Sequence, residues 1–221
     1  MELTLEQDGD ALVLVFERPI LARSVLGELV DRLDELAAAG PHAPVVLVSK
    51  HPTIFLAGAH LGEIAELDAD SCRPYAALGR GVARRLAHHP APVVAAVHGS
   101  CSGGGFDLVL ACDTVVASPA ATFSHPGVLR GLVTGWGGTV ALPSAVGRAT
   151  ARRALLEGSA LTAADLRDAG VVVEVADDPR PAALDLARRL HRLHPSRLPL
   201  WRVLRGPRFI DRFRAVVIEN S

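Results

Sequence analysis

Hydrophobic and polar residues alternate along residues 3–17, LTLEQDGDALVLVFE, on both sides of an Asp-Gly-Asp turn. Alternation with a period of two, interrupted by a short turn, predicts a β-hairpin. The pattern then takes on the helical period, and we expect a helix that Ser24 caps and Gly40 ends. Its apolar face is formed by leucines: Leu26, Leu29, Leu33 and Leu36.

Continuous apolar stretches follow at residues 44–50 (PVVLVSK) and 92–99 (PVVAAVHG). Short strands of this kind are typical of a parallel sheet that is covered on both faces. Because strands and helices alternate along the rest of the chain, the pattern predicts an α/β fold with parallel strands. Further strands are expected at residues 113–119, 121–127 and 171–176. Helices are expected at residues 75–89, 106–111, 137–147, 149–158 and 163–170, the last capped by Thr162.

Composition limits the possible partners. The 221 residues suffice for one domain, or for one domain with a small appendage. Aromatic residues make up only 4%, so the core must consist mainly of Ala, Val and Leu. A net charge of -1 provides no field that would favour nucleic acid or an anionic membrane, and we expect neither as a partner.

Cysteines and the N-terminus bear on the cellular compartment. Cys72, Cys101 and Cys112 are an odd number without metal-like spacing, which favours free thiols in a reducing environment. The stretch MELTLEQDGD has neither the basic start nor the apolar core of a signal peptide. No apolar run approaches the length that spans a bilayer. These features predict a cytoplasmic protein.

The composition changes from Arg180 onward, where the chain holds ten arginines. We therefore divide the sequence into a core at residues 1–178 and an Arg-rich C-terminal helical segment at residues 179–221. Two interpretations of the segment stay open: arginines on an ordinary helix surface, or a basic patch for phosphate groups. Lys50 is the only lysine, so arginine carries nearly all the positive charge and its clustering is weak support for a patch.

Two stretches share one design: FLAGAHL at residues 55–61 and HGSCSGGGFDL at residues 98–108. Each places small residues after a buried strand, where a helix is about to begin. The free N–H groups of such a turn and the helix dipole attract an anion, and two converging turns form an oxyanion hole for a carbonyl. Small residues let a ligand approach the backbone. The alternative is that they serve only close strand–helix packing.

Several motifs, in their order and spacing, resemble the crotonase family, the enoyl-CoA hydratase/isomerase group, over residues 10–176. The motifs are FLAGAHL, PVVAAVHGSCSGGGFDLVLACDTVVAS, ATFSHPGVLRGLVTGWGGTVALPSAVG and ALLEGSALTAADLRDAGVVVEVA. The resemblance implies a crotonase-like spiral of ββα units with a shortened C-terminal helical region, assembled as a trimer or hexamer. It implies lyase or isomerase chemistry on an acyl-CoA thioester. No metal is implied, and coenzyme A enters only as part of the substrate.

Binding residues follow from the same resemblance, position by position. The carbonyl oxygen of the thioester would accept hydrogen bonds from the backbone N–H groups of Ala59 and Gly104. Coenzyme A would lie near Ala57, Ala59 and Leu61. Trp136, Gly127 and Thr134 fall where the family has its acyl pocket, although Trp136 also fits a plain core aromatic.

The acid–base positions depart from the family pattern. Hydratases of the family use two glutamates, whose places are taken here by Asp107 and Gly127, so we expect poor hydration of ordinary enoyl-CoA substrates. Asp107 is the best remaining acid–base candidate, with a carboxylate that merely complements the helix dipole as the alternative. His125 titrates near neutrality and can lean into the space that the missing side chain leaves at Gly127. A structural histidine is the alternative there. His60 replaces an aspartate of the family and fits a cap of the following helix.

The resemblance leaves two other functions open besides a thioester enzyme. One is a non-catalytic relative that binds acyl-CoA. The other is a serine hydrolase like the Clp protease, which shares the fold. In that hydrolase Ser102 or Ser100 would be the nucleophile, with His125 and Asp113 as its partners.

Overall fold

The computed structural model describes residues 2–39 and 43–193. Its largest element is a sheet in which β1 and β2 are antiparallel and every later strand is parallel to its neighbour. The hairpin predicted from the alternating pattern is confirmed, with Asp8 opposite Ala11 at the turn. The strand order is β1 (Leu3–Asp8), β2 (Ala11–Phe16), β4 (Val45–Ser49), β7 (Val93–Val97), β9 (Thr114–Ala117) and β12 (Val172–Val175).

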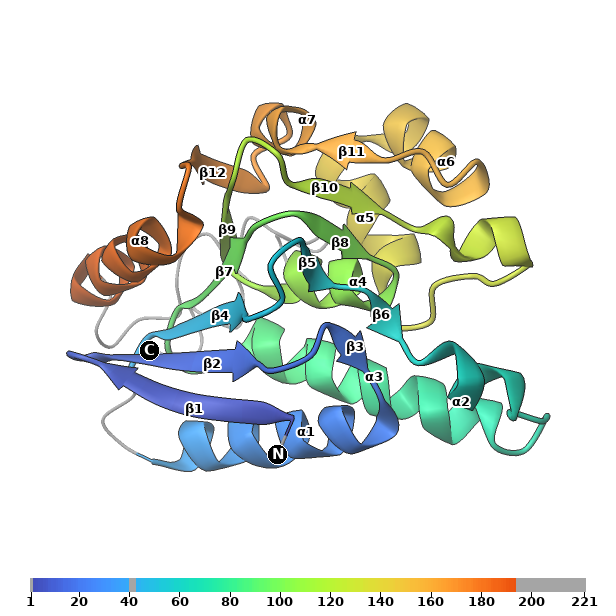
Figure 1. Ribbon diagram of the computed structural model, residues 1–221, viewed down its shortest axis with the longest axis horizontal. Helices are drawn as coiled ribbons and strands as arrows, with labels where there is room; N and C mark the ends of the chain where they lie inside the picture. Colours follow the sequence, from blue (N-terminus) through green and yellow to red (C-terminus); the bar gives the residue numbers. More distant parts are fainter. Residues whose placement is uncertain (1, 40–42, 194–221) are drawn as a thin grey trace, which may run out of the picture.

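A smaller sheet is interleaved with the first along the chain. Its strands, in order across the sheet, are β11 (Leu161–Thr162), β10 (Thr122–Ser124), β8 (Ser100–Ser102) and β5 (Ile54–Leu56). Each of β4, β7 and β9 is followed by a strand of the smaller sheet and then by helical structure, so the chain advances in ββα turns (Figure 1). Two short strands, β3 (Ile20–Leu21) and β6 (Gly58–Ala59), form a separate parallel pair. The predicted spiral of ββα units is therefore confirmed.

Helices cover both faces of the large sheet, which explains its continuous apolar strands. One face packs against α1 (Arg23–Ala38), α3 (Cys72–His88) and α4 (Gly104–Ala111), and α1 and α3 lie side by side (Figure 1). The opposite face packs against α8 (Pro179–Leu193) through a separate apolar cluster. The remaining helices are α2 (Leu61–Ala65), the 3-10 helix η1 (Pro126–Arg130), α5 (Gly138–Val146), α6 (Arg148–Leu156) and α7 (Ala163–Asp168).

Two of the predicted helix caps are confirmed and one is wrong. Thr162 caps α7 in a capping box with Asp165, and the His60 ring accepts a hydrogen bond from the Glu63 N–H at the start of α2. Ser24 does not cap α1, which begins one residue earlier. The Glu63 carboxylate accepts the Arg23 N–H instead, at 2.9 Å. A carboxylate from a distant part of the chain thus replaces the expected local cap.

The C-terminal segment is described as far as Leu193, and its later arginines lie outside the described residues. Arg188 pairs with Asp8 and Asp10 of the β1–β2 hairpin, and Arg180 pairs with Glu6 at 2.7 Å. These arginines bind acidic side chains of their own chain, which favours the surface interpretation for this part. The domain boundary at residue 178 stays a prediction. None of the described helices combines the length and apolar composition needed to cross a bilayer.

Candidate active site

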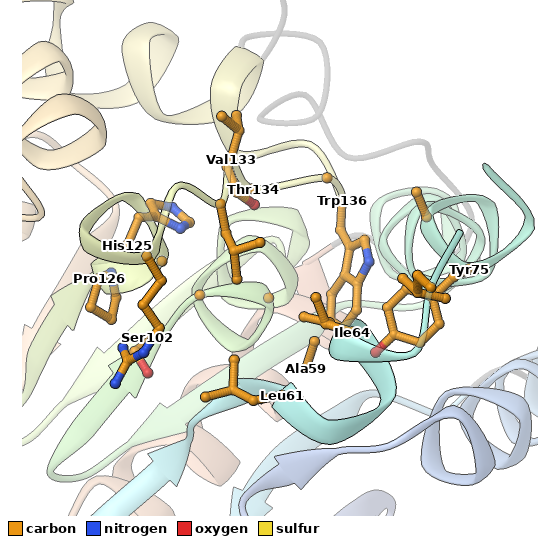
Figure 2. Close-up of a pocket in the computed structure, with 18 of the residues that line it drawn as sticks. Ala59, Leu61, Ile64, Tyr75, Ser102, His125, Pro126, Val133, Thr134 and Trp136 are labelled. Carbon is orange, nitrogen blue, oxygen red and sulfur yellow. The ribbon is translucent and has the colours of Figure 1, made fainter. Parts of the chain in front are cut away.

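A cavity of about 390 Å3 lies where the β5–α2 turn, the β8–α4 turn and the β10–α5 segment meet. Most of the residues that the sequence assigned to the site line it: Ala57, Ala59, Leu61, Gly104, His125, Gly127, Thr134 and Trp136 (Figure 2). Asp107 is the exception and lies behind this wall. Two segments far apart in sequence, residues 57–61 and 125–136, therefore come together as the resemblance implied.

The two small-residue turns touch at Gly58. Its φ of +86° lies in the left-handed region, and a Cβ there would lie 2.8 Å from the Gly104 nitrogen and 2.9 Å from the Ser102 carbonyl oxygen. Only glycine therefore allows the turn before α2 to approach the first residue of α4 this closely. Ala59 and Gly104, the two predicted N–H donors, consequently lie on neighbouring parts of the cavity wall. Gly104 is also at the positive end of the α4 dipole.

Each glycine of the triplet has a packing or conformational reason to be glycine. Gly103 has a φ of +55° at the N-cap of α4. A Cβ at Gly104 would lie 2.1 Å from the Trp136 indole, and one at Gly105 would lie 2.5 Å from the Leu56 Cβ. Close packing therefore accounts for the triplet without a ligand. The role of the Gly104 N–H as an oxyanion donor stays a prediction.

Asp107 lies in the first turn of α4 with no exposed side-chain surface. One carboxylate oxygen, Oδ2, accepts hydrogen bonds from the Thr134 hydroxyl and, at 3.1 Å, from the Trp136 N–H. The other, Oδ1, lies 3.5 Å from His125 Nε2. Burial raises the pKa of Asp107 to about 6, although the hydrogen bonds from Thr134 and Trp136 act in the opposite direction. The carboxylate is therefore mostly ionised at neutral pH.

His125 lines the cavity and lies beside the buried Asp107. Its ring stacks on Phe106 with centroids 5.1 Å apart, and burial lowers its pKa to about 4. Neither ring nitrogen has a hydrogen-bond partner among the described residues. At neutral pH the site therefore pairs a neutral imidazole with a buried carboxylate. Because its pKa is higher than that of His125, the carboxylate is the stronger base of the pair and the group that holds a proton once the pair takes one up.

The expectation that His125 fills the space left at Gly127 is wrong. A Cβ at Gly127 would point toward Leu132, with the Leu132 Cβ at 3.3 Å as its nearest neighbour. The ring of His125 instead lies between Phe106 and Asp107. The residues after η1, rather than the histidine, thus border the place of the second family glutamate.

The structure does not assemble the predicted hydrolase triad. Asp113 accepts the Val93 N–H at 2.8 Å, at the end of α4 and β7 opposite the cavity. The Ser102 hydroxyl donates to the Ala57 carbonyl oxygen at 3.2 Å. His125 hydrogen-bonds to neither residue. Ser100, the other proposed nucleophile, lies in β8 and is not part of the cavity wall.

Several cavity residues were not foreseen from the sequence, among them Ile64, Tyr75 and Arg130. Ile64 and Tyr75 contribute apolar surface from α2 and α3, and burial raises the pKa of Tyr75 to about 12, so its phenol is neutral. Arg130 is the one charged side chain among the described residues that line the cavity. Tyr75 and Gly79 are spaced four residues apart, on one face of a helix, but nothing in this spacing indicates that Trp136 packs there.

Comparison with known proteins identifies the family. The family Enoyl-CoA hydratase/isomerase matches residues 10–196. The 2,3-dehydroadipyl-CoA hydratase of Escherichia coli K12 is 34% identical over 207 residues, covering 89% of this chain and 78% of that protein. The mitochondrial methylglutaconyl-CoA hydratase of Rattus norvegicus is 29% identical, and the chain spans only 62% of its length.

Solved structures give the same result. The structure of DspI from Pseudomonas aeruginosa superposes with a TM-score of 0.84 at 29% identity, covering 92% of this chain and 84% of that one. An enoyl-CoA hydratase from Mycobacterium smegmatis superposes with a TM-score of 0.78 at 29% identity, covering 87% and 76%. Together with the cavity between the two small-residue turns, these similarities show that the chain belongs to the enoyl-CoA hydratase/isomerase family of the crotonase superfamily, whose members act on acyl-CoA thioesters.

Proposed function

We propose that this protein is a CoA-thioester enzyme that stabilises an enolate in an oxyanion hole, with an Asp107–His125 pair in place of two glutamates. The observation that carries the proposal is the contact between the Gly58 turn and the start of α4, which places Ala59 and Gly104 on one cavity wall. Backbone N–H groups aimed at a thioester oxygen stabilise the negative charge that develops there when a proton leaves the α-carbon. The only cofactor the proposal needs is the coenzyme A of the substrate, near Ala57 and Leu61.

We assign proton transfer to the Asp107–His125 pair, in which His125 is the member that lines the cavity. Neutral His125 relays the α-proton to Asp107, whose Oδ1 lies 3.5 Å from His125 Nε2 and whose pKa of about 6 makes it the final acceptor. Reprotonation of the enolate at another carbon, or loss of a leaving group, completes an isomerase or lyase reaction. The missing carboxylate at Gly127 leaves no second group to orient water, so standard hydration is expected to be slow.

The test is a mass-spectrometric screen of acyl-CoA thioesters, crotonyl-CoA included, with binding measured in parallel. We expect at least one thioester to be converted and crotonyl-CoA to be hydrated slowly. Binding without conversion across the panel would favour the non-catalytic relative instead. Failure of every thioester to bind would contradict both. Light scattering of the same sample tests the trimeric or hexameric assembly, which, like the cytoplasmic location, stays a prediction.

Activity should fall on the acidic side of neutrality. If the pair works with Asp107 ionised and His125 neutral, protonation of the carboxylate removes the working form as the pH drops through about 6, the pKa to which burial raises Asp107. The turnover number should therefore decrease tenfold for each further pH unit below that value. A turnover number that stays constant through this range, in protein shown to be folded, would rule out a titrating role for Asp107.

Ser102 should not react with a fluorophosphonate probe. Its hydroxyl donates to the Ala57 carbonyl oxygen and has no base beside it, so it is not an activated nucleophile. Mass spectrometry of the intact, probe-treated protein should show no adduct. Labelling that disappears in Ser102→Ala would revive the hydrolase alternative.

A further inference from the structure

Trp136 lies in a slot between two helices, and each helix has a glycine where the indole packs. A Cβ at Gly79 on α3 would lie 2.2 Å from the ring, and a Cβ at Gly104 at the start of α4 would lie 2.1 Å from it. Any larger residue at either position would displace the indole, because packed interiors leave no spare volume. The two glycines and the tryptophan therefore form one packed unit.

This unit is also one end of the cavity. Trp136 is only 5% exposed, yet its surface contributes to the cavity wall. The Tyr75 ring lies beside it, tilted, with the ring centroids 6.4 Å apart. Figure 2 shows both rings next to Ile64, on the side of the cavity opposite Pro126 and Ser102. This end of the cavity is thus closed by aromatic side chains, and the Tyr75 hydroxyl there is buried without a hydrogen-bond partner among the described residues.

The position of the indole relative to Gly104 limits how far an acyl chain can extend toward α3. A carbonyl oxygen that accepts the Gly104 N–H lies about 3 Å from that nitrogen, and the indole touches the same residue. An acyl chain that runs from there toward α3 therefore meets the ring after a few carbon atoms. The ring lies against the backbone at both Gly79 and Gly104, so close packing on two sides limits its movement.

We propose that Trp136 closes the acyl end of the cavity and restricts the protein to short-chain acyl-CoA thioesters, an inference that rests on the proposed function. The indole excludes longer chains by occupying the volume into which they would extend. A smaller side chain at position 136 opens that volume between α3 and α4. A longer acyl chain then gains apolar contacts with the cavity wall.

The experiment compares the binding of butyryl-CoA and octanoyl-CoA, two saturated thioesters with no double bond to hydrate or shift. The wild type should bind butyryl-CoA at least ~10-fold more tightly, and Trp136→Ala should reverse the preference by a similar factor or more. Leu142→Ala is the matched control, since it removes a fully buried apolar side chain that does not line the cavity. It should keep the wild-type ratio. If Trp136→Ala does not fold, Trp136→Leu decides the question by the same ratio.

The outcomes separate this inference from the proposed function. Equal binding of the two thioesters by the wild type, or an unchanged ratio in the folded Trp136 variant, would overturn the chain-length limit while leaving CoA-thioester binding intact. A wild type that binds neither thioester would overturn the proposed function and this inference together. Tight binding of butyryl-CoA alone, with octanoyl-CoA admitted by the variant, supports both.

Discussion

Asp107→Asn should lower the turnover number by about 10² to 10⁴-fold on whichever thioester the wild type converts best, with little change in KM. The asparagine oxygen can still accept the Trp136 N–H and the Thr134 hydroxyl, so the wall of the cavity should keep its shape. What the variant loses is the negative charge 3.5 Å from His125 Nε2. A neutral amide cannot take up the proton, so proton transfer to the pair becomes unfavourable.

Stability measurements distinguish this loss from misfolding. The pKa of Asp107 rises from 3.8 in the unfolded chain to about 6 in the folded protein, so the folded state binds this proton more tightly. The resulting stability is present below the unfolded pKa and is lost as the pH rises through the folded one. At neutral pH the ionised carboxylate thus costs on the order of 3 kcal/mol, and Asp107→Asn should melt at the same temperature as the wild type or higher.

Asp113→Asn provides the matched control for Asp107. It changes another buried carboxylate, which accepts the Val93 N–H at the far end of α4. We expect it to keep the wild-type turnover number per folded molecule. Equal turnover in Asp107→Asn and Asp113→Asn would remove Asp107 from the mechanism and favour its simpler role at the helix N-terminus.

The fold could be predicted from the sequence wherever local periodicity determines structure. The alternation at residues 3–17 and the apolar runs of β4 and β7 depend only on which faces are buried, so hairpin and parallel strands were both foreseen. The cap of α1 was missed because it comes from Glu63, which only the folded chain brings to Arg23. A local rule cannot supply a partner from another element.

The site was foreseen as a set of residues but not as an arrangement. Asp107 and His125 were separate candidates, and nothing in their spacing shows that β10 and α4 bring them within 3.5 Å of each other. The burial of Asp107 behind Thr134 depends on the path of the segment that leads to α5. The close packing of Gly104 against Trp136 likewise depends on that path, which no motif encodes.

Gly58→Ala should lower the turnover number by about 10² to 10³-fold, because the substitution displaces both oxyanion donors at once. A Cβ at this position would lie 2.8 Å from the Gly104 nitrogen and 2.9 Å from the Ser102 oxygen, both of them backbone atoms that cannot rotate away. The turn that carries Ala59 must therefore move away from α4. The two N–H groups then no longer converge on one carbonyl oxygen.

The matched control is Gly170→Ala, which separates this effect from backbone strain. Gly170 has a φ of +75°, close to the +86° of Gly58, but a Cβ there would meet nothing within 4 Å. Both variants should therefore lose about 1–2 kcal/mol of stability to the left-handed conformation, whereas only Gly58→Ala meets the additional clash. Turnover per folded molecule, with the folded fraction taken from circular dichroism, should stay near wild type in Gly170→Ala and collapse in Gly58→Ala. A folded Gly58→Ala with wild-type turnover would show that the contact between the two turns serves packing alone, and the oxyanion hole would have to be sought elsewhere on the cavity wall.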